Sequence, residues 1–453
     1  MDIESLSQKG FAIFSHYIHY IAQTLPTTMS AFVNPKRALI NPLVLISWIL
    51  LVKLSYTDAF VSRSYLPEVR PQSPSSKACL SMTTESKSMQ GCVCVVTGAS
   101  RGIGKGVATE LGKQGATVYI TGTSTSTQND NNNLNQETRN GLFSFGKKDT
   151  STNIGSQDMF VSNSVVGGPE TIEVAAKEVT KAGGLGIPVY CDHSKDEQVE
   201  ALFERVKKEQ GRLDLLVNNA FRIPPGGADD LFSKFWDGDF GKTWDSIHTV
   251  GSRSHFIASC YAVPIMKENN PKTMGQMQQP LIAMISSFGG ITYTFNVAYG
   301  VGKAAVDRMA KDMAFELETE GIACTSFYPG VVLTERTQRL VETGEWDETV
   351  GIPLENSESP AYSGKAIVAV ATDRTDTTMS KSGTFQVVAE LAQEYDFTDI
   401  DGKRPPSIRS LKFLLPAYGM DQEMREKVPE WLIPDWKLPF WIMANGAPPS
   451  KED

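Results

Sequence analysis

From residue 91 onward, short apolar runs alternate with stretches of helical periodicity, and this alternation limits the fold more than any other feature of the chain. Strands separated by helices indicate a parallel sheet with helices on both faces, the doubly wound α/β arrangement. The sequence predicts helices at 105–114, 171–181 and 197–208, and strands at 92–96, 116–121, 187–191, 213–217, 281–285 and 322–328.

Residues 1–90 do not follow this alternation and are interpreted as a targeting segment and linker. Lys36 and Arg37 precede an uncharged run at 38–52 that is too short for a comfortable membrane span. The stretch after Phe60 is rich in Ser, Arg and Lys. A signal followed by such a stretch resembles the bipartite presequences of algae whose plastids lie inside extra membranes. The alternative is a signal-anchor for the endoplasmic reticulum, and Met29 is an alternative start.

Two later segments also depart from the pattern, so a single domain is expected at 91–419. Residues 123–168 are rich in Ser, Thr, Asn and Gly and far exceed the usual loop length, so we expect a disordered surface insertion or a regulatory arm. The tail at 420–453 combines tryptophans and aliphatic residues without a long apolar run. Such a tail suits a membrane surface, or packs on its own domain or on a partner subunit of a homo-oligomer.

Composition excludes some classes of function. The net charge of -9 and the absence of a basic stripe disfavour a nucleic-acid partner. The six cysteines show neither zinc-ligand spacing nor a disulfide framework, so we expect buried, reduced thiols and no metal site.

The first strand leads directly into a glycine-rich turn, Thr97–Gly104, that opens a helix. Glycines let the backbone approach a pyrophosphate, and free N–H groups at the helix N-terminus attract the anion. Gly106 stands where a nucleotide triphosphatase needs Ser or Thr. A dinucleotide-binding turn is therefore predicted, in which Gly98, Gly102 and Gly104 let the backbone approach the pyrophosphate.

The second strand ends without the acidic residue that would hold the ribose 2′-hydroxyl of NAD. Arg101 instead stands in the turn, where it could meet a 2′-phosphate. NADP(H) is therefore favoured over NAD(H). Asp192, at the end of the third strand, could accept from an adenine amino group, and Asn218–Ala220 ends the fourth strand, where ligands bind in open α/β sheets.

Tyr299 and Lys303 are spaced so that they lie one turn apart on one face of a helix. A free tyrosine has a pKa near ~10, too high for proton exchange at neutral pH. A neighbouring ammonium and a positive nicotinamide would stabilise the phenolate and lower that pKa. A serine hydroxyl beside the pair, from Ser286 or Ser287, could orient a substrate oxygen.

In this order the motifs resemble the short-chain dehydrogenase/reductase family: Thr97-Gly98-x-x-x-Gly102-x-Gly104, Asn218-Asn219-Ala220, Ser…Tyr299-x-x-x-Lys303 and Pro329-Gly330-x-x-x-Thr334. The resemblance implies a Rossmann-type domain that interconverts a small-molecule carbonyl, here a lipophilic ketone or aldehyde, and its alcohol. It implies that Tyr299 is the catalytic acid/base, that Lys303 holds the nicotinamide ribose and tunes Tyr299, and that Ser287 orients the carbonyl. The cofactor contacts that it implies come from Tyr299 and Lys303 and from Ser100, Arg101, Ile103, Asp192, Asn218, Ala220 and Thr334.

Two positions depart from the family pattern. Gly251 stands where most members carry an Asn that holds a relay water, and water, Arg253 or His255 could substitute for it. Ser286 has the usual spacing from the tyrosine, but Ser287 is preferred because it is the second serine of the pair, as in relatives. The glycine leaves open an alternative function, a dinucleotide-binding sensor or scaffold with little turnover.

Overall fold

The computed structural model describes residues 87–126, 170–269, 277–344, 346, 350–374, 377–420 and 422–444. The predicted targeting segment up to residue 86 and the predicted insertion beyond residue 126 lie outside these ranges, so both remain predictions.

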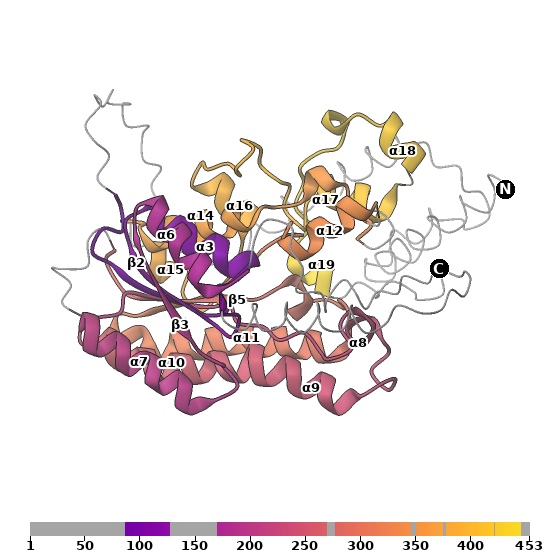
Figure 1. Cartoon of the computed structure of the whole chain (residues 1–453). Coiled ribbons are helices and arrows are strands. Elements are labelled where there is room, and N and C mark those ends of the chain that lie inside the picture. Colours follow the sequence, from indigo (N-terminus) through magenta and orange to yellow (C-terminus); the bar gives the residue numbers. More distant parts are fainter. Residues whose placement is uncertain are drawn as a thin grey trace, which may run out of the picture. The chain divides into compact units, whose positions relative to one another are not determined.

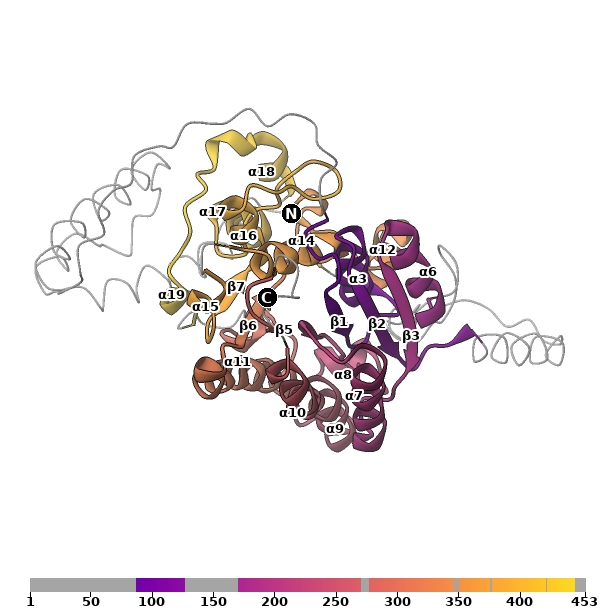
Figure 2. The same cartoon turned by 90° about the vertical axis from the view of Figure 1, so that its left-hand side faces the viewer.

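A seven-stranded parallel sheet forms the centre of the domain, with the strand order β3-β2-β1-β4-β5-β6-β7. The helices α3, α6, α14 and α16 cover one face, and α7, α9, α10 and α11 lie on the other (Figures 1 and 2). This is the predicted doubly wound fold. The strands are β1 Val93–Val96, β2 Thr117–Gly122, β3 Leu185–Tyr190, β4 Leu215–Asn218, β5 Leu281–Ile285, β6 Ala323–Tyr328 and β7 Phe385–Val387.

The helices fall between and after these strands. They are α3 Gly102–Lys113, α6 Ile172–Ala182, α7 Asp196–Gln210, α8 Ala228–Phe232, α9 Phe240–His248, η2 Thr249–Arg253, α10 Ser254–Lys267, η4 Phe288–Gly290, α11 Val297–Leu317, α12 Glu335–Thr343, α14 Pro360–Ala371, α15 Thr377–Ser380, α16 Val388–Glu394, α17 Leu411–Leu414, η7 Leu415–Gly419, α18 Gln422–Lys427 and α19 Phe440–Ala444.

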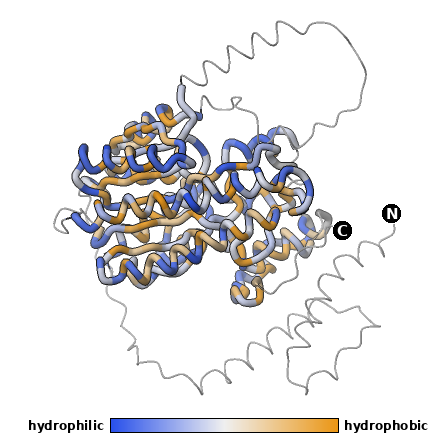
Figure 3. Tube along the Cα trace, turned by 90° about the horizontal axis from the view of Figure 1, so that it is seen from below, coloured by the Kyte–Doolittle hydropathy of each residue, from blue (hydrophilic) through white to orange (hydrophobic). Residues whose placement is uncertain are grey.

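The two faces of the sheet have separate apolar cores. In β1, Cys94 and Val96 pack on one side, while Val93 and Val95 pack on the other, because successive side chains of a strand point to opposite faces. Figure 3 shows hydrophobic residues recurring along the covering helices, interrupted by hydrophilic ones. The sheet is therefore buried on both sides, which explains why its strands are continuous apolar runs.

Several expected boundaries were wrong. The helix after the glycine turn begins at Gly102, not at residue 105, so the glycines form its first turn. The third strand begins and ends earlier than expected, and the short strand β7 was not foreseen. The expectation of buried thiols fails for Cys260, which is exposed on α10, whereas Cys92, Cys94, Cys191 and Cys324 are buried.

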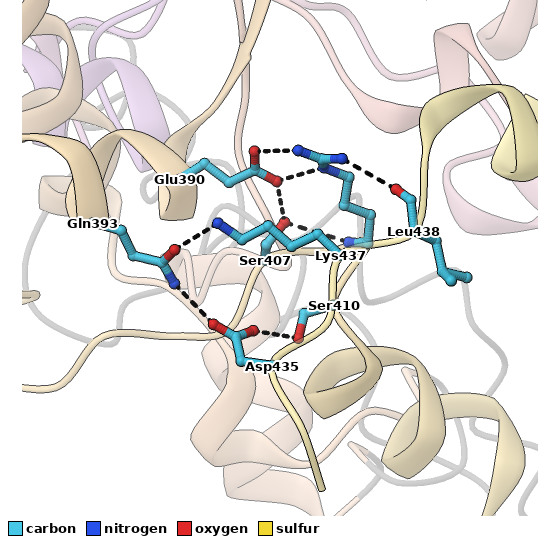
Figure 4. A network of polar contacts seen from close by, with 8 residues as sticks. Glu390, Gln393, Ser407, Ser410, Asp435, Lys437 and Leu438 are labelled. Atoms are coloured by element: carbon cyan, nitrogen blue, oxygen red, sulfur yellow. Dashed lines mark hydrogen bonds and ion pairs between the residues drawn. The ribbon is translucent and has the colours of Figure 1, made fainter. Parts of the chain in front are cut away.

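The described part of the aromatic tail packs on its own domain (Figure 4). Arg409 donates to both carboxylate oxygens of Glu390 on α16 and to the carbonyl oxygen of Leu438. Asp435 accepts from Ser410, and the ring of Phe440 meets that of Phe385 in β7 edge to face at 4.7 Å. Large apolar side chains nevertheless remain exposed on the tail, namely Trp431, Leu432 and Trp441. No helix within the described ranges is both long and apolar enough to cross a membrane.

Candidate active site

The glycine turn between β1 and α3 lies directly against the end of β4. Gly98 has a φ of +64°, and a Cβ added there would lie 2.8 Å from the Cα of Ala220. A Cβ on Gly104 would lie 2.4 Å from Nδ2 of Asn219. Only glycine fits at such close approaches, so both predicted positions are explained by backbone packing.

Side chains lock the ends of these two strands together. The hydroxyl oxygen of Thr97 accepts from the backbone N–H groups of Asn219, at 2.9 Å, and Ala220, at 3.0 Å. Nδ2 of Asn219 donates to the carbonyl oxygens of Thr97 and Gly98 at 2.8 and 2.9 Å. The strand order reverses between β1 and β4, which is where doubly wound sheets bind their ligands.

An acidic side chain caps the N-terminus of α3. The N–H of Gly102 donates to Oε2 of Glu335 at 2.8 Å, and the ammonium of Lys105 lies 3.8 Å from Oε1. The side chain of Arg101, the N-cap residue, makes no capping bond. Since helix N-termini bind anions, this carboxylate stands in for a phosphate. Thr334, the N-cap of α12, lies against Gly102, where a Cβ would be 3.5 Å from its Cγ2.

Arg101 lies beyond the end of β2, as the NADP(H) prediction requires. Its guanidinium donates to the hydroxyl of Ser124 and pairs with Glu170 at 2.9 Å. Burial and the charge of Arg101 both lower the pKa of Arg336 on α12, which places a second guanidinium nearby. The positive charge of Arg101 is therefore paired with the carboxylate of Glu170 near the place where a 2′-phosphate is predicted.

Asp192 lies just after β3, and Asn218 is the last residue of β4. Oδ1 of Asp192 accepts from the N–H of Ser194 at 2.9 Å and from Arg222 at 2.8 Å. Burial raises the pKa of this carboxyl, but the bonds from Ser194 and Arg222 outweigh it and the pKa is lowered. Nδ2 of Asn218 donates to Ser259 at 3.0 Å, whereas its buried Oδ1 has no partner among the described residues.

The N-cap of α11 positions Tyr299. Oδ1 of Asn296 accepts from the N–H of Tyr299 at 2.9 Å, and its Nδ2 donates to the carbonyl oxygen of Asp230 at 2.9 Å. Oγ of Ser287 accepts from the N–H of Gly289 at 2.9 Å, and a Cβ added to Gly289 would lie 2.6 Å from Cε1 of Tyr299 and 3.3 Å from Oγ of Ser287. The predicted serine and tyrosine thus meet.

Ser286 points elsewhere. Its hydroxyl donates to the carbonyl oxygen of Lys303 at 3.3 Å, and Ser286 lowers the pKa of the neighbouring carboxyl of Asp307. Tyr328 donates to the same carboxyl at 2.5 Å. Burial raises the pKa of Asp307. This geometry favours Ser287 over Ser286 as the serine that faces a substrate oxygen.

Lys303 is buried one helical turn after Tyr299. Its ammonium donates to the carbonyl oxygen of Ile285 at 3.1 Å. Burial lowers the pKa of this lysine to about 8, against the opposing charge of Asp307. Its nitrogen lies 5.8 Å from the ring centroid of Tyr299, so the pair is adjacent as predicted.

The expected sign of the tyrosine's own pKa shift was wrong. Burial raises the pKa of Tyr299 to about 12, the hydrogen bond with Ser287 lowers it less, and Asp307 raises it further. A lysine one turn away does not by itself make this phenol acidic, because burial of the phenolate costs more.

Aromatic rings surround the tyrosine. The ring centroid of Phe295 lies 4.8 Å from that of Tyr299 and 5.2 Å from that of Phe232, and Phe221 lies 5.9 Å from Tyr299, all edge to face. Phe295 has a φ of +61°, which is strained for a residue with a side chain. Such strain recurs at functional sites, and the rings make the surroundings of the hydroxyl apolar.

The structure therefore brings together Ser287, Tyr299 and Lys303, predicted to be catalytic, between β5 and the N-terminal turns of α11, and the glycine turn, predicted to bind phosphate, at the ends of β1 and β4. Arg253 lies outside both: it forms a two-pronged ion pair with Asp196, each half exposed, so it does not substitute for the missing Asn. Sequence reasoning missed Glu335, Glu170 and Phe221. Only Glu335 had a local signal, as an acidic residue directly after Thr334.

The residues present fit a dinucleotide. A phosphate could take the place of the Glu335 carboxylate at the N–H of Gly102, where Gly98 and Gly104 keep the backbone close, and a ribose hydroxyl or nicotinamide amide could donate to the unpaired Oδ1 of Asn218. No group of His, Cys, Asp and Glu suited to a metal occurs in the part of the chain that the structure describes.

Comparisons with known proteins show which family the chain belongs to. The family model described as short chain dehydrogenase matches residues 145–345. Dehydrogenase/reductase SDR family member 1 of Mus musculus is 35% identical over 360 residues, covering 76% of this chain and 96% of the relative. The Homo sapiens protein of that name is 36% identical, covering 72% and 89%. A solved structure from Xanthomonas campestris has a TM-score of 0.50 at 21% identity, covers 70% of this chain and 94% of its own, and supports the fold alone. The chain therefore belongs to the short-chain dehydrogenase/reductase (SDR) family of oxidoreductases, which bind a nicotinamide dinucleotide and act on small molecules.

Proposed function

We propose that the protein interconverts a lipophilic ketone or aldehyde and its alcohol, uses NADP(H), and employs Tyr299 as general acid/base. The observation that carries the proposal is that Tyr299 and Ser287 meet beside Gly289, next to the aromatic rings of Phe221 and Phe295 and one turn from Lys303. A hydroxyl pair beside aromatic rings suits a substrate with one polar carbonyl on a hydrophobic body.

Each residue has a separate task in this reaction. The glycine turn at Gly98–Gly104 and Lys303 would hold a nicotinamide dinucleotide, which would supply or accept the hydride at the substrate carbon. Ser287 donates a hydrogen bond that fixes the carbonyl oxygen, and Tyr299 gives its proton to that oxygen as the alcohol forms. Because burial raises its pKa, Tyr299 holds this proton at neutral pH. In the reverse direction, the ammonium of Lys303, together with a positive nicotinamide, would stabilise the phenolate.

The preference for NADP(H) is supported by charge. Arg101 and Arg336 supply positive charge beyond the end of β2, and β2 itself ends without an acidic residue. The carboxylate of Glu170 opposes a phosphate there, so binding would require Arg101 to exchange this partner, or share it.

The test is NADPH oxidation by the full chain against a panel of ketones and aldehydes, beside Tyr299→Phe. We expect Tyr299→Phe to bind NADPH normally and to lose at least about a hundredfold in kcat, within the range for a general acid. Tyr261→Phe, on the helix layer of α7 and α10, is the matched control and should keep full activity. Equal turnover by wild type and Tyr299→Phe would refute the mechanism.

The second candidate is a dinucleotide-binding protein with little turnover. Gly251 favours it, because the side chain that usually holds a relay water is missing. NADPH binding without measurable wild-type turnover on any member of the panel would support this candidate over the first.

Plastid targeting by residues 1–90 and contact of the exposed tail tryptophans with a membrane surface are also proposed. A fluorescent protein fused after residue 90, and flotation of the purified chain with anionic vesicles, would test them separately.

A further inference from the structure

The ring of Phe221 fills the space beside Gly251. A Cβ added to Gly251 would lie 3.1 Å from Cδ2 of that ring. Lys303 also neighbours this ring, and its side-chain nitrogen lies 5.3 Å from the ring centroid. Phe221 therefore stands between the lysine and the position where the family pattern places an Asn.

The backbone conformation at Gly251 leaves room for the ring of Phe221. Gly251 lies in η2, at a kink between α9 and α10, with a φ of +153° and a ψ of -25° that residues with side chains avoid. The N–H of Arg222 donates to the carbonyl oxygen of Val250 at 3.0 Å, which ties the loop after β4 to this kink. Kinks of the π type recur at functional sites.

The lysine is held by one carbonyl oxygen and by aromatic faces. Its ammonium donates to Ile285 and lies over the rings of Phe221 and Tyr299. The titratable groups that face it are Tyr299 and Asp307 on α11 and His255 on α10. His255 is neutral, because burial and the charge of Lys303 lower its pKa to about 3, and its Nε2 bonds to the carbonyl oxygen of Ala220 at 3.0 Å.

We propose that Phe221 is a positioning residue: its ring holds the Lys303 ammonium beside Tyr299, in place of the Asn and water of the family pattern. The inference rests on the proposed function for its role in turnover. A cation over an aromatic face is stabilised most where water is excluded. The ring thus favours the charged lysine, against the burial that lowers its pKa.

The test compares Phe221→Leu, which keeps the bulk and removes the aromatic face, with Phe221→Tyr, which keeps the face. The titration of Lys303 is followed by NMR of Cε-labelled lysine in the full chain, with Lys303→Arg to assign the signal. We expect the pKa of Lys303 to fall by about 0.5 to 1 pH unit in Phe221→Leu and to stay unchanged in Phe221→Tyr. The alkaline limb of the kcat profile should move down by the same amount, with the Kd for NADPH changed less than about twofold.

An unchanged lysine titration in Phe221→Leu, or the same shift in both variants, would overturn the proposal. Thermal midpoints check that the variants fold, and Phe221→Met replaces the leucine if needed. Because the NMR titration needs no turnover, it decides the matter even if the wild type reduces no carbonyl, a result that would refute only the proposed function.

Discussion

Replacing Arg101 is the sharpest test of how the site chooses its dinucleotide. The guanidinium is mostly buried, at 22% side-chain exposure, and pairs with an equally buried Glu170 at 2.9 Å. A charge-assisted hydrogen bond in such surroundings contributes about 1.5–3 kcal/mol, and each ~1.4 kcal/mol is tenfold in affinity. Arg101→Ala should therefore weaken NADPH binding about 10- to 100-fold and change NADH binding by less than about threefold.

Glu170→Gln should change NADPH affinity in the opposite direction. Removing the carboxylate frees Arg101 for a 2′-phosphate and removes a like charge, so NADPH should bind about 3- to 10-fold more tightly, with NADH again little changed. Dissociation constants would come from quenching of protein fluorescence at fixed ionic strength. Arg205→Ala, which breaks an exposed pair with Glu209 on α7, is the control. Equal losses for NADPH and NADH in Arg101→Ala would refute the assignment of the 2′-phosphate site.

Two further substitutions test the packing and the pH dependence of the site. Gly104→Ala puts a Cβ 2.4 Å from Nδ2 of Asn219 and should lower the free energy of unfolding by about 1–3 kcal/mol. The control Gly241→Ala, at an exposed position of α9, should not lower it. Urea unfolding measures both variants, and equal free energies of unfolding would contradict the close approach at Gly104. Burial raises the pKa of Glu358, which accepts from the N–H of Gly330, to about 8. The folded state therefore favours the protonated acid, and this stabilisation is lost as the pH rises from about 4.5 to about 8. Between about pH 4.5 and 8, the Tm of wild type and of the exposed control Glu355→Gln should therefore fall, whereas the Tm of Glu358→Gln should fall less. An equal fall in Tm for all three proteins would argue against a buried acid at Glu358.

The sequence was sufficient for the sheet because each of its central strands is a continuous apolar run. The strand at 281–285 has the bounds that its apolar residues predict, since Leu281–Ile285 is buried throughout. In contrast, β7 has only three residues, two of them half-buried, and such a segment carries no periodic signal. The glycine turn was predicted, but the start of α3 at Gly102 was not, because it depends on backbone hydrogen bonds rather than on composition.

The candidate site was predictable where motif residues are close in sequence and unpredictable where contacts are distant. Tyr299, Lys303 and Ser287 lie within one strand-to-helix connection, so their meeting follows from local order. The pairing of Arg101 with Glu170 joins residues on either side of a long insertion. The pKa of Tyr299 depends on burial by rings from three segments, which no spacing in the chain encodes.

The contacts of the tail have a practical consequence for anyone who shortens this chain. The composition alone places the end of the domain at Gly419. A chain cut there would lack Phe440, which packs on the ring of Phe385, and Leu438, whose carbonyl oxygen accepts from Arg409. The last strand of the sheet would lose a covering side chain, and uncovered sheet edges recruit strands from other molecules. A chain cut after residue 419 should therefore be prone to self-association, whereas one that extends to Ala444 keeps these contacts.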